Sequence, residues 1–242
     1  MVDHQLDPRD YPWTEQARVG VLHRGGFREG ARGEEVGGRT PVVAVGSNAA
    51  ATVLAAKLGG LLAAGVPMGT ATVDGLHIGH SAHVSARGYV AAAPARGARV
   101  QPVTVCWFDP AQLQELDATE PNYRRVLLPP GMPCRLVGGT HRSAGPAGGR
   151  RVQGAQIYES VHGVLADGGT ALTLRAQSAV LRWLAARLPR DLRSSLTHAQ
   201  LVDPDVRERV RRAVLDAGLS MPSGLTHPGP CSGRVRRRPG PA

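Results

Sequence analysis

The stretch that decides the fold is residues 42–48, with the sequence Val-Val-Ala-Val-Gly-Ser-Asn. Its β-branched residues predict a buried strand over 40–45, which ends at Gly46. Residues 50–58 are rich in alanine and predict a helix that Asn48 can cap. A strand-to-helix turn of this kind presents backbone N–H groups at the positive end of the helix dipole, where an anion or a developing oxyanion is stabilised. An ordinary capped turn has the same pattern, so the stretch alone leaves both interpretations open.

A second segment, over 109–121, carries a candidate general base. Asp109 suits a helix N-cap and Pro110 suits the first helical position. Pro121 cannot continue a helix, so the helix is predicted to end near Glu120. A carboxylate at this place can accept and return a proton. The alternative is an exposed glutamate that pairs with one of the arginines that follow it.

The remaining pattern predicts an α+β protein. Residues 1–39 show no steady period and are expected to form a loosely ordered arm that is partly ordered around Trp13 and Val19–Leu22. A strand region is expected from 66–73 continuing through 76–84, and further strands are expected over 88–93, 100–108, 123–128 and 152–158. Two helices, over 172–188 and from Asp203-Pro204 onward, form the helical extension expected over 176–221, and a disordered basic tail is expected over 222–242.

The formal net charge of the 242 residues is +10, but it is unevenly distributed. Residues 41–140 are nearly neutral, whereas residues 141–242 hold sixteen arginines against seven acidic residues. An arginine run among prolines and glycines at 234–238 is typical of a solvated tail. We therefore do not expect nucleic acid as the partner, although the tail leaves salt-dependent nucleic-acid binding open as an alternative.

The apolar run over 49–68 approaches the length of a membrane span. Lys57 lies near its middle, which costs about 2.5–3.5 kcal/mol in lipid, and Gly59-Gly60 interrupts it. We therefore expect a helix of a water-soluble protein and no membrane partner. The polar first residues show no apolar leader segment, which predicts a cytoplasmic location.

Histidines and cysteines suggest other chemistry only weakly. His77, His80 and His83 follow one another at three-residue spacing, but a strand would place His80 on the opposite face from the other two. A metal site is therefore not expected, and a serine–histidine hydrolase is disfavoured because the glycine that closes a nucleophile elbow is missing. Cys106 lies in an expected strand and is interpreted as a core residue.

The order of the two segments resembles that of the gamma-glutamylcyclotransferase-like superfamily. The resemblance covers about residues 40–175 and rests on the Gly-Ser-Asn turn and on Leu116-Asp117-x-x-Glu120 followed by a Tyr-Arg strand. It implies a small mixed β-barrel surrounded by helices, to which the C-terminal helices are an extension. The chain departs from the family at Val45, where a tyrosine is usual, and at Pro121, where glycine is frequent.

The resemblance also implies a site and a reaction. Glu120 corresponds to the essential glutamate, and the substrate would be bound by the residues of the turn together with two tyrosines: Val45, Gly46, Ser47, Asn48, Tyr123 and Tyr158. The implied reaction releases 5-oxoproline from a small γ-glutamyl amide without a metal or an organic cofactor. The alternative is a non-catalytic protein of the same fold that binds a small molecule or serves as a scaffold. The oligomeric state is not predicted.

Overall fold

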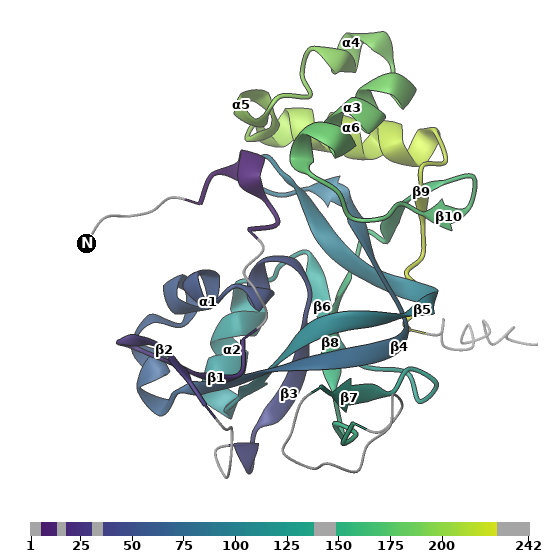
Figure 1. Ribbon diagram of the computed structural model, residues 1–242. Coiled ribbons are helices and arrows are strands. Elements are labelled where there is room, and N and C mark those ends of the chain that lie inside the picture. Colours follow the sequence, from purple (N-terminus) through teal and green to yellow (C-terminus); the bar gives the residue numbers. More distant parts are fainter. Residues whose placement is uncertain (1–5, 14–17, 31–35, 138–148, 227–242) are drawn as a thin grey trace, which may run out of the picture.

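The computed structural model describes residues 6–13, 18–30, 36–137 and 149–226. The expected α+β class is confirmed, because a large and mostly antiparallel sheet is combined with several helices (Figure 1). Its spine is formed by two long strands, β4 (Val66–Val84) and β5 (Val90–Phe108), which pair antiparallel with each other. β4 matches the strand region expected from 66 through 84, whereas β5 unites the two strands that the sequence predicts over 88–93 and 100–108. Gly75, with φ +70°, lies at a register shift inside β4.

The remaining strands extend the sheet on both sides of this pair. The order is β10-β9-β4-β5-β3-β8-β6. The bounds of the added strands are β3 (Thr40–Ala44), β6 (Tyr123–Leu127), β8 (Gln156–Ser160), β9 (Val164–Asp167) and β10 (Thr170–Ala171). Among the described residues β3 and β8 form the one parallel pair.

The expected closed barrel is not what the strand order gives, because β10 and β6 end the sheet on opposite sides and the sheet stays open. The reason lies in β4, whose two halves pair with different partners. Its first half pairs with β1 (Gly20–His23) and β7 (Cys134–Leu136), and its far end meets β9. A register shift against β5 between Asp74 and Leu76 separates these parts of the strand, and a second shift, between His80 and Val84, spans the contact with β9.

Short helices cover one side of the part of the sheet that contains β3 and the first half of β4. After β3 come η3 (Gly46–Ala49), α1 (Ala51–Leu58) and η4 (Gly59–Ala64), and α2 (Pro110–Ala118) follows β5. The expected start of α2 is confirmed, because the Asp109 side chain accepts from the Gln112 N–H at 2.8 Å and Pro110 is the first helical residue. The helix ends at Ala118, so Glu120 lies just beyond it.

The described parts of residues 1–39 are ordered around Trp13 and over 19–22, where order was expected, and the order extends to residues 26–29. They contain η1 (Pro8–Asp10), β1 and β2 (Gly26–Glu29), and β1 adds to the edge of the sheet beside β4. Val21 and Leu22 are buried there. A short apolar run between glycines was sufficient to form an edge strand.

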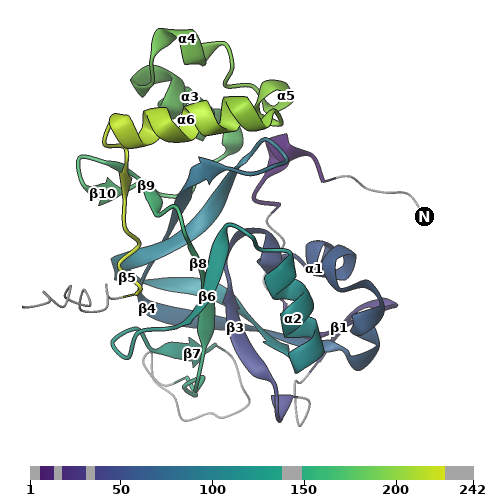
Figure 2. The same ribbon diagram turned by 180° about the vertical axis from the view of Figure 1, so that it is seen from behind.

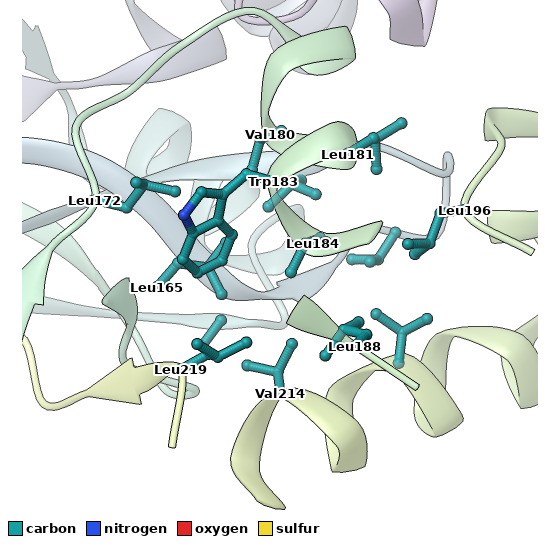
Figure 3. Close-up of a cluster of buried hydrophobic side chains, with 14 of the residues drawn as sticks. Leu165, Leu172, Val180, Leu181, Trp183, Leu184, Leu188, Leu196, Val214 and Leu219 are labelled. Atoms are coloured by element: carbon teal, nitrogen blue, oxygen red, sulfur yellow. The ribbon is translucent and has the colours of Figure 1, made fainter. Parts of the chain in front are cut away.

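The C-terminal helices gather at one end of the β4–β5 ribbon (Figures 1 and 2). They are α3 (Gln177–Arg187), α4 (Arg190–Arg193), α5 (His198–Leu201) and α6 (Pro204–Asp216), and they are followed by β11 (Ser220–Met221). Their apolar side chains share one core with the sheet: in Figure 3, Trp183 and Leu184 of α3 lie close to Leu165 of β9 and Val214 of α6. The helical extension is therefore packed on the sheet.

The chain after β11 returns to the sheet. The Glu159 carboxylate accepts from Ser223 Oγ and from Thr226 Oγ1, and Arg124 Nε lies 2.8 Å from it. Burial acts to raise the pKa of Glu159, but hydrogen bonds from Ser223 and Arg124 outweigh it and lower the pKa. Residues 222–226 are therefore ordered, whereas the rest of the expected basic tail lies outside the described residues.

The Gln177 side chain joins α3 to the sheet by bonding to both backbone groups of Val90, as a neighbouring strand would. Its side-chain oxygen accepts from the Val90 N–H at 2.9 Å, and its side-chain amide donates to the Val90 carbonyl at 3.0 Å. Gln177 is fully buried, so no water can replace these bonds.

Replacing Gln177 with alanine should lower the free energy of unfolding by about 1–3 kcal/mol for each Val90 backbone group that is left without a partner. Chemical denaturation of wild type and variant measures the change. Gln114→Ala is the control, because Gln114 is an exposed glutamine on α2 and its loss should be nearly neutral. Equal stability of the two variants would contradict the expectation.

Candidate functional site

The two segments singled out in the sequence meet at a cavity of about 470 Å³. The residues that line it come from seven parts of the chain: the N-terminal segment, the turn around η3, α1, the turn after α2, the tip of the β4–β5 hairpin with the ends of its strands, β6 and β8. Of the seven expected site residues, six line this cavity: Val45, Ser47, Asn48, Glu120, Tyr123 and Tyr158. Gly46 is not among the lining residues.

The Glu120 carboxylate is held by two donors. Its Oε1 lies 2.6 Å from Lys57 Nζ and accepts from Asn48 Nδ2 at 2.9 Å. Lys57 Nζ also donates to Asn48 Oδ1 at 2.8 Å, which closes a triangle of three side chains. Glu120 is 13% exposed and Lys57 is 19% exposed, so the ion pair is partly shielded from water while facing the cavity.

Asn48 therefore has a different role from the one expected. Helix α1 begins after Ala50 without a side-chain cap, and the turn before it is a 3₁₀ helix. The Asn48 side chain instead links Glu120 to Lys57 across the site. An amide supplies both a donor and an acceptor, which is what a bridge between a carboxylate and an ammonium requires.

Gly46 is covered by the N-terminal segment. A side chain at this position would meet the Tyr11 hydroxyl and would lie 2.8 Å from the Ala92 methyl group. Its φ of +70° is a second reason for glycine. The oxygen of Tyr11 accepts from the Ala92 N–H at 2.7 Å. The glycine turn thus faces a tyrosine hydroxyl, and the expectation of bare amide groups that face the cavity is corrected at this position.

The two other tyrosines are fixed by hydrogen bonds. Tyr123 Oη donates to the Ala92 carbonyl at 2.8 Å, and Tyr158 Oη donates to Asp117 Oδ1 at 2.6 Å. Burial raises the pKa of both phenols, so both stay protonated near neutral pH. Asp117 also forms a bidentate pair with Arg125, and the hydrogen bond from Arg125 lowers the pKa of Asp117.

Sequence reasoning missed Lys57 and Tyr11 as site residues. A signal for Lys57 was present, because it is the chain's single lysine and lies in an otherwise apolar helix. Nothing in the sequence places Tyr11 beside Gly46, since no hydrophobic period connects the N-terminal segment to the sheet.

A buried polar network lies next to the cavity. His83 Nδ1 lies 2.5 Å from Ser81 Oγ, which lies 2.7 Å from Ser160 Oγ. Ser81 is fully buried, so a substrate cannot reach it as a nucleophile. Within the described ranges no group of three or more His, Cys, Asp or Glu side chains is placed to hold a metal ion. Burial raises the pKa of the Cys106 thiol to about 12, which makes it unreactive.

Comparison with known proteins gives no family. No family model matches the chain, and no curated protein matches it. Among the residues that the structure describes, no helix has both the length and the apolar character that crossing a bilayer requires.

Replacing Gly46 with alanine should cost more stability than the same change at Gly154. Both glycines have positive φ, +70° and +63°, so both variants carry the same type of backbone strain, about 1–2 kcal/mol. A side chain at Gly154 meets nothing within 4 Å, whereas one at Gly46 displaces Tyr11. Thermal unfolding measures both variants, and equal midpoints would argue against the Tyr11 contact.

Two buried histidines should make the fold sensitive to acid. Burial lowers the pKa of His80 to about 4 and that of His83 to about 3, from an ordinary 6.5. Because the folded-state pKa lies below the unfolded one, this stability is present above pH 6.5 and is lost as the pH falls. We expect the unfolding free energy to drop by up to about 1.4 kcal/mol per pH unit for each histidine between pH 6 and 5. Denaturation across that window tests this, and His80→Phe should halve the slope.

Proposed function

We propose that the chain is a gamma-glutamylcyclotransferase-like enzyme that cleaves a small γ-glutamyl-type amide and releases 5-oxoproline. One observation carries the proposal: the Glu120 carboxylate faces a cavity of about 470 Å³ and is bonded to Asn48 of the glycine turn. A cavity of this volume accommodates a small molecule. A carboxylate at its wall can exchange protons with an amine bound there.

The proposed reaction uses a nucleophile that the substrate already contains. The substrate's α-amine attacks its own γ-carbonyl carbon, a five-membered lactam forms, and the bond to the attached amine breaks. Intramolecular attack of this kind reaches effective molarities of about 10⁵–10⁸ M. Glu120 first accepts a proton from the substrate's α-ammonium, which frees the lone pair that attacks, and gives this proton to the leaving nitrogen. It passes the second proton that the attacking nitrogen loses to the same leaving group, which departs as an ammonium, so the protein ends the cycle unchanged.

Lys57 gives the site a means of exchanging charge partners. In the empty site its ammonium neutralises Glu120 at 2.6 Å. The ammonium group of a bound substrate would take that place beside Glu120, and Lys57 would then be available to pair with the substrate's carboxylate. Asn48 already bonds to both side chains and would hold them through the exchange.

The cysteines fit a cytoplasmic location, which we include in the proposal. Cys106 and Cys134 are free and buried among the described residues. Unpaired thiols are normal in a reducing compartment.

The second candidate function is binding without turnover on the same scaffold. The observation that favours it is that the charge of Glu120 is already neutralised inside the protein by Lys57. Val45, where the family usually has tyrosine, points the same way. This alternative predicts a ligand that binds in the cavity and is released unchanged.

Replacing Glu120 with glutamine should lower kcat for 5-oxoproline release by about 10²–10⁴-fold, because the side chain keeps its size and loses the ability to accept a proton. Wild type and variant are compared on a panel of γ-glutamyl amides, with 5-oxoproline and free amine both measured. Glu115→Gln is the matched control, since Glu115 is an exposed residue of α2. Equal turnover by Glu120→Gln would remove Glu120 as the base, and binding by a wild type that releases no product would favour the second candidate.

A further inference from the structure

Tyr11 is held rigidly at the edge of the cavity. Its ring stacks on Tyr89 with the centroids 4.3 Å apart, and Trp13 meets it edge-on at 5.0 Å. Trp13 is itself fixed, since its indole N–H donates to the Asp7 carbonyl at 2.8 Å. Three rings from two distant parts of the chain thus fix the direction of one hydroxyl group.

The Tyr11 hydroxyl accepts a hydrogen bond through its oxygen, whereas its proton is not used as a donor within the described part of the chain. It accepts from the Ala92 N–H at 2.7 Å. No acceptor for the Tyr11 O–H proton is found among the described residues. Tyr11 is 3% exposed and lines the cavity. A buried donor without a partner costs about 1–3 kcal/mol, so a ligand that supplies an acceptor oxygen is favoured here.

We propose that the Tyr11 O–H donates a hydrogen bond to the substrate's reacting carbonyl oxygen, so that the N-terminal segment supplies the oxyanion donor of the site. This inference rests on the proposed function and deepens it. Because Tyr11 covers Gly46, the phenol takes the place of the turn's amides as the oxyanion donor: the Ala92 N–H of β5 bonds to the phenol oxygen, and the phenol proton bonds to the substrate. Such a chain of hydrogen bonds polarises the final donor.

The step balances without any additional reactant. As the α-amine forms its bond to the carbonyl carbon, the π electrons of the C=O bond move onto the oxygen, which accepts a stronger hydrogen bond from Tyr11. The phenol proton stays on Tyr11 throughout. When the bond to the leaving amine breaks, the carbonyl forms again and the hydrogen bond weakens. Burial raises the pKa of the Tyr11 phenol, so it remains a donor at neutral pH.

The test is Tyr11→Phe in the full chain, with Tyr89→Phe as the matched control. Both changes remove one hydroxyl from the same ring cluster and keep the stacking. Loss of one oxyanion donor lowers kcat by about 10²–10³-fold, whereas KM should change less than threefold. Tyr89→Phe keeps the ring that positions Tyr11 and should lower kcat far less than Tyr11→Phe does. Thermal unfolding confirms that both variants are folded at the assay temperature.

The outcomes separate the two proposals. A wild type that releases no 5-oxoproline overturns the proposed function and this inference with it. An active wild type with an equally active Tyr11→Phe overturns the inference alone. A Tyr11→Phe variant that is faster than wild type also overturns it, because Tyr11 would then block the site.

A fluorinated tyrosine introduced at position 11 guards against a variant that merely loosens the segment. The ring keeps its hydroxyl, and the more acidic phenol is a stronger hydrogen-bond donor. We therefore expect kcat at neutral pH to stay at or above the wild-type value. A kcat as low as that of Tyr11→Phe would overturn the inference.

Discussion

The structure depends on the pairing of β4 with β5. One antiparallel ladder runs from Met68 opposite Cys106 to Val84 opposite Val90. The other strands of the sheet pair along its two sides, and the C-terminal helices pack on its hairpin end. Successive side chains along each strand point to opposite faces of the sheet. The same ladder places Ala92 next to the cavity, where its N–H bonds to Tyr11 and its carbonyl accepts from Tyr123. One residue of β5 thus fixes two of the tyrosines of the site.

The site's electrostatics follow from two ion pairs. Glu120 and Lys57 neutralise each other in a partly shielded position, and Asp117 and Arg125 form a second, more exposed pair. Lys57 lies on α1 and Glu120 follows α2, so the first pair forms only when these two segments have packed together. No residue of α3 to α6 lines the cavity, but the C-terminal charge still acts there: burial, the neighbouring His162 and Arg207 of α6 all lower the pKa of His83, which lines the cavity.

The sequence was most informative where local chemistry decides the structure. Asp109 and Pro110 predict the start of α2 because a capping side chain and a missing N–H act within one turn. The strand before Gly46 was predictable for the same reason. The proximity of Asn48 to Glu120 could be expected from the order of two motifs, although the direct bond between them could not. Tertiary contacts decided the rest. Stacking on Tyr89 holds Tyr11 beside Gly46. The sheet stays open because β4 changes partners along its length.

The bond between Glu159 and the chain beyond β11 sets the shortest workable C-terminus. A protein that stopped at Met221 would retain every helix of the extension, yet it would leave the Glu159 carboxylate with Arg124 as its one remaining side-chain donor among the described residues. The carboxylate is 4% exposed when residues 222–226 are in place, so their removal would open it to water and replace its bonds to Ser223 and Thr226 with bonds to solvent. Shortened versions for crystallisation or fusion should therefore keep the chain through Thr226.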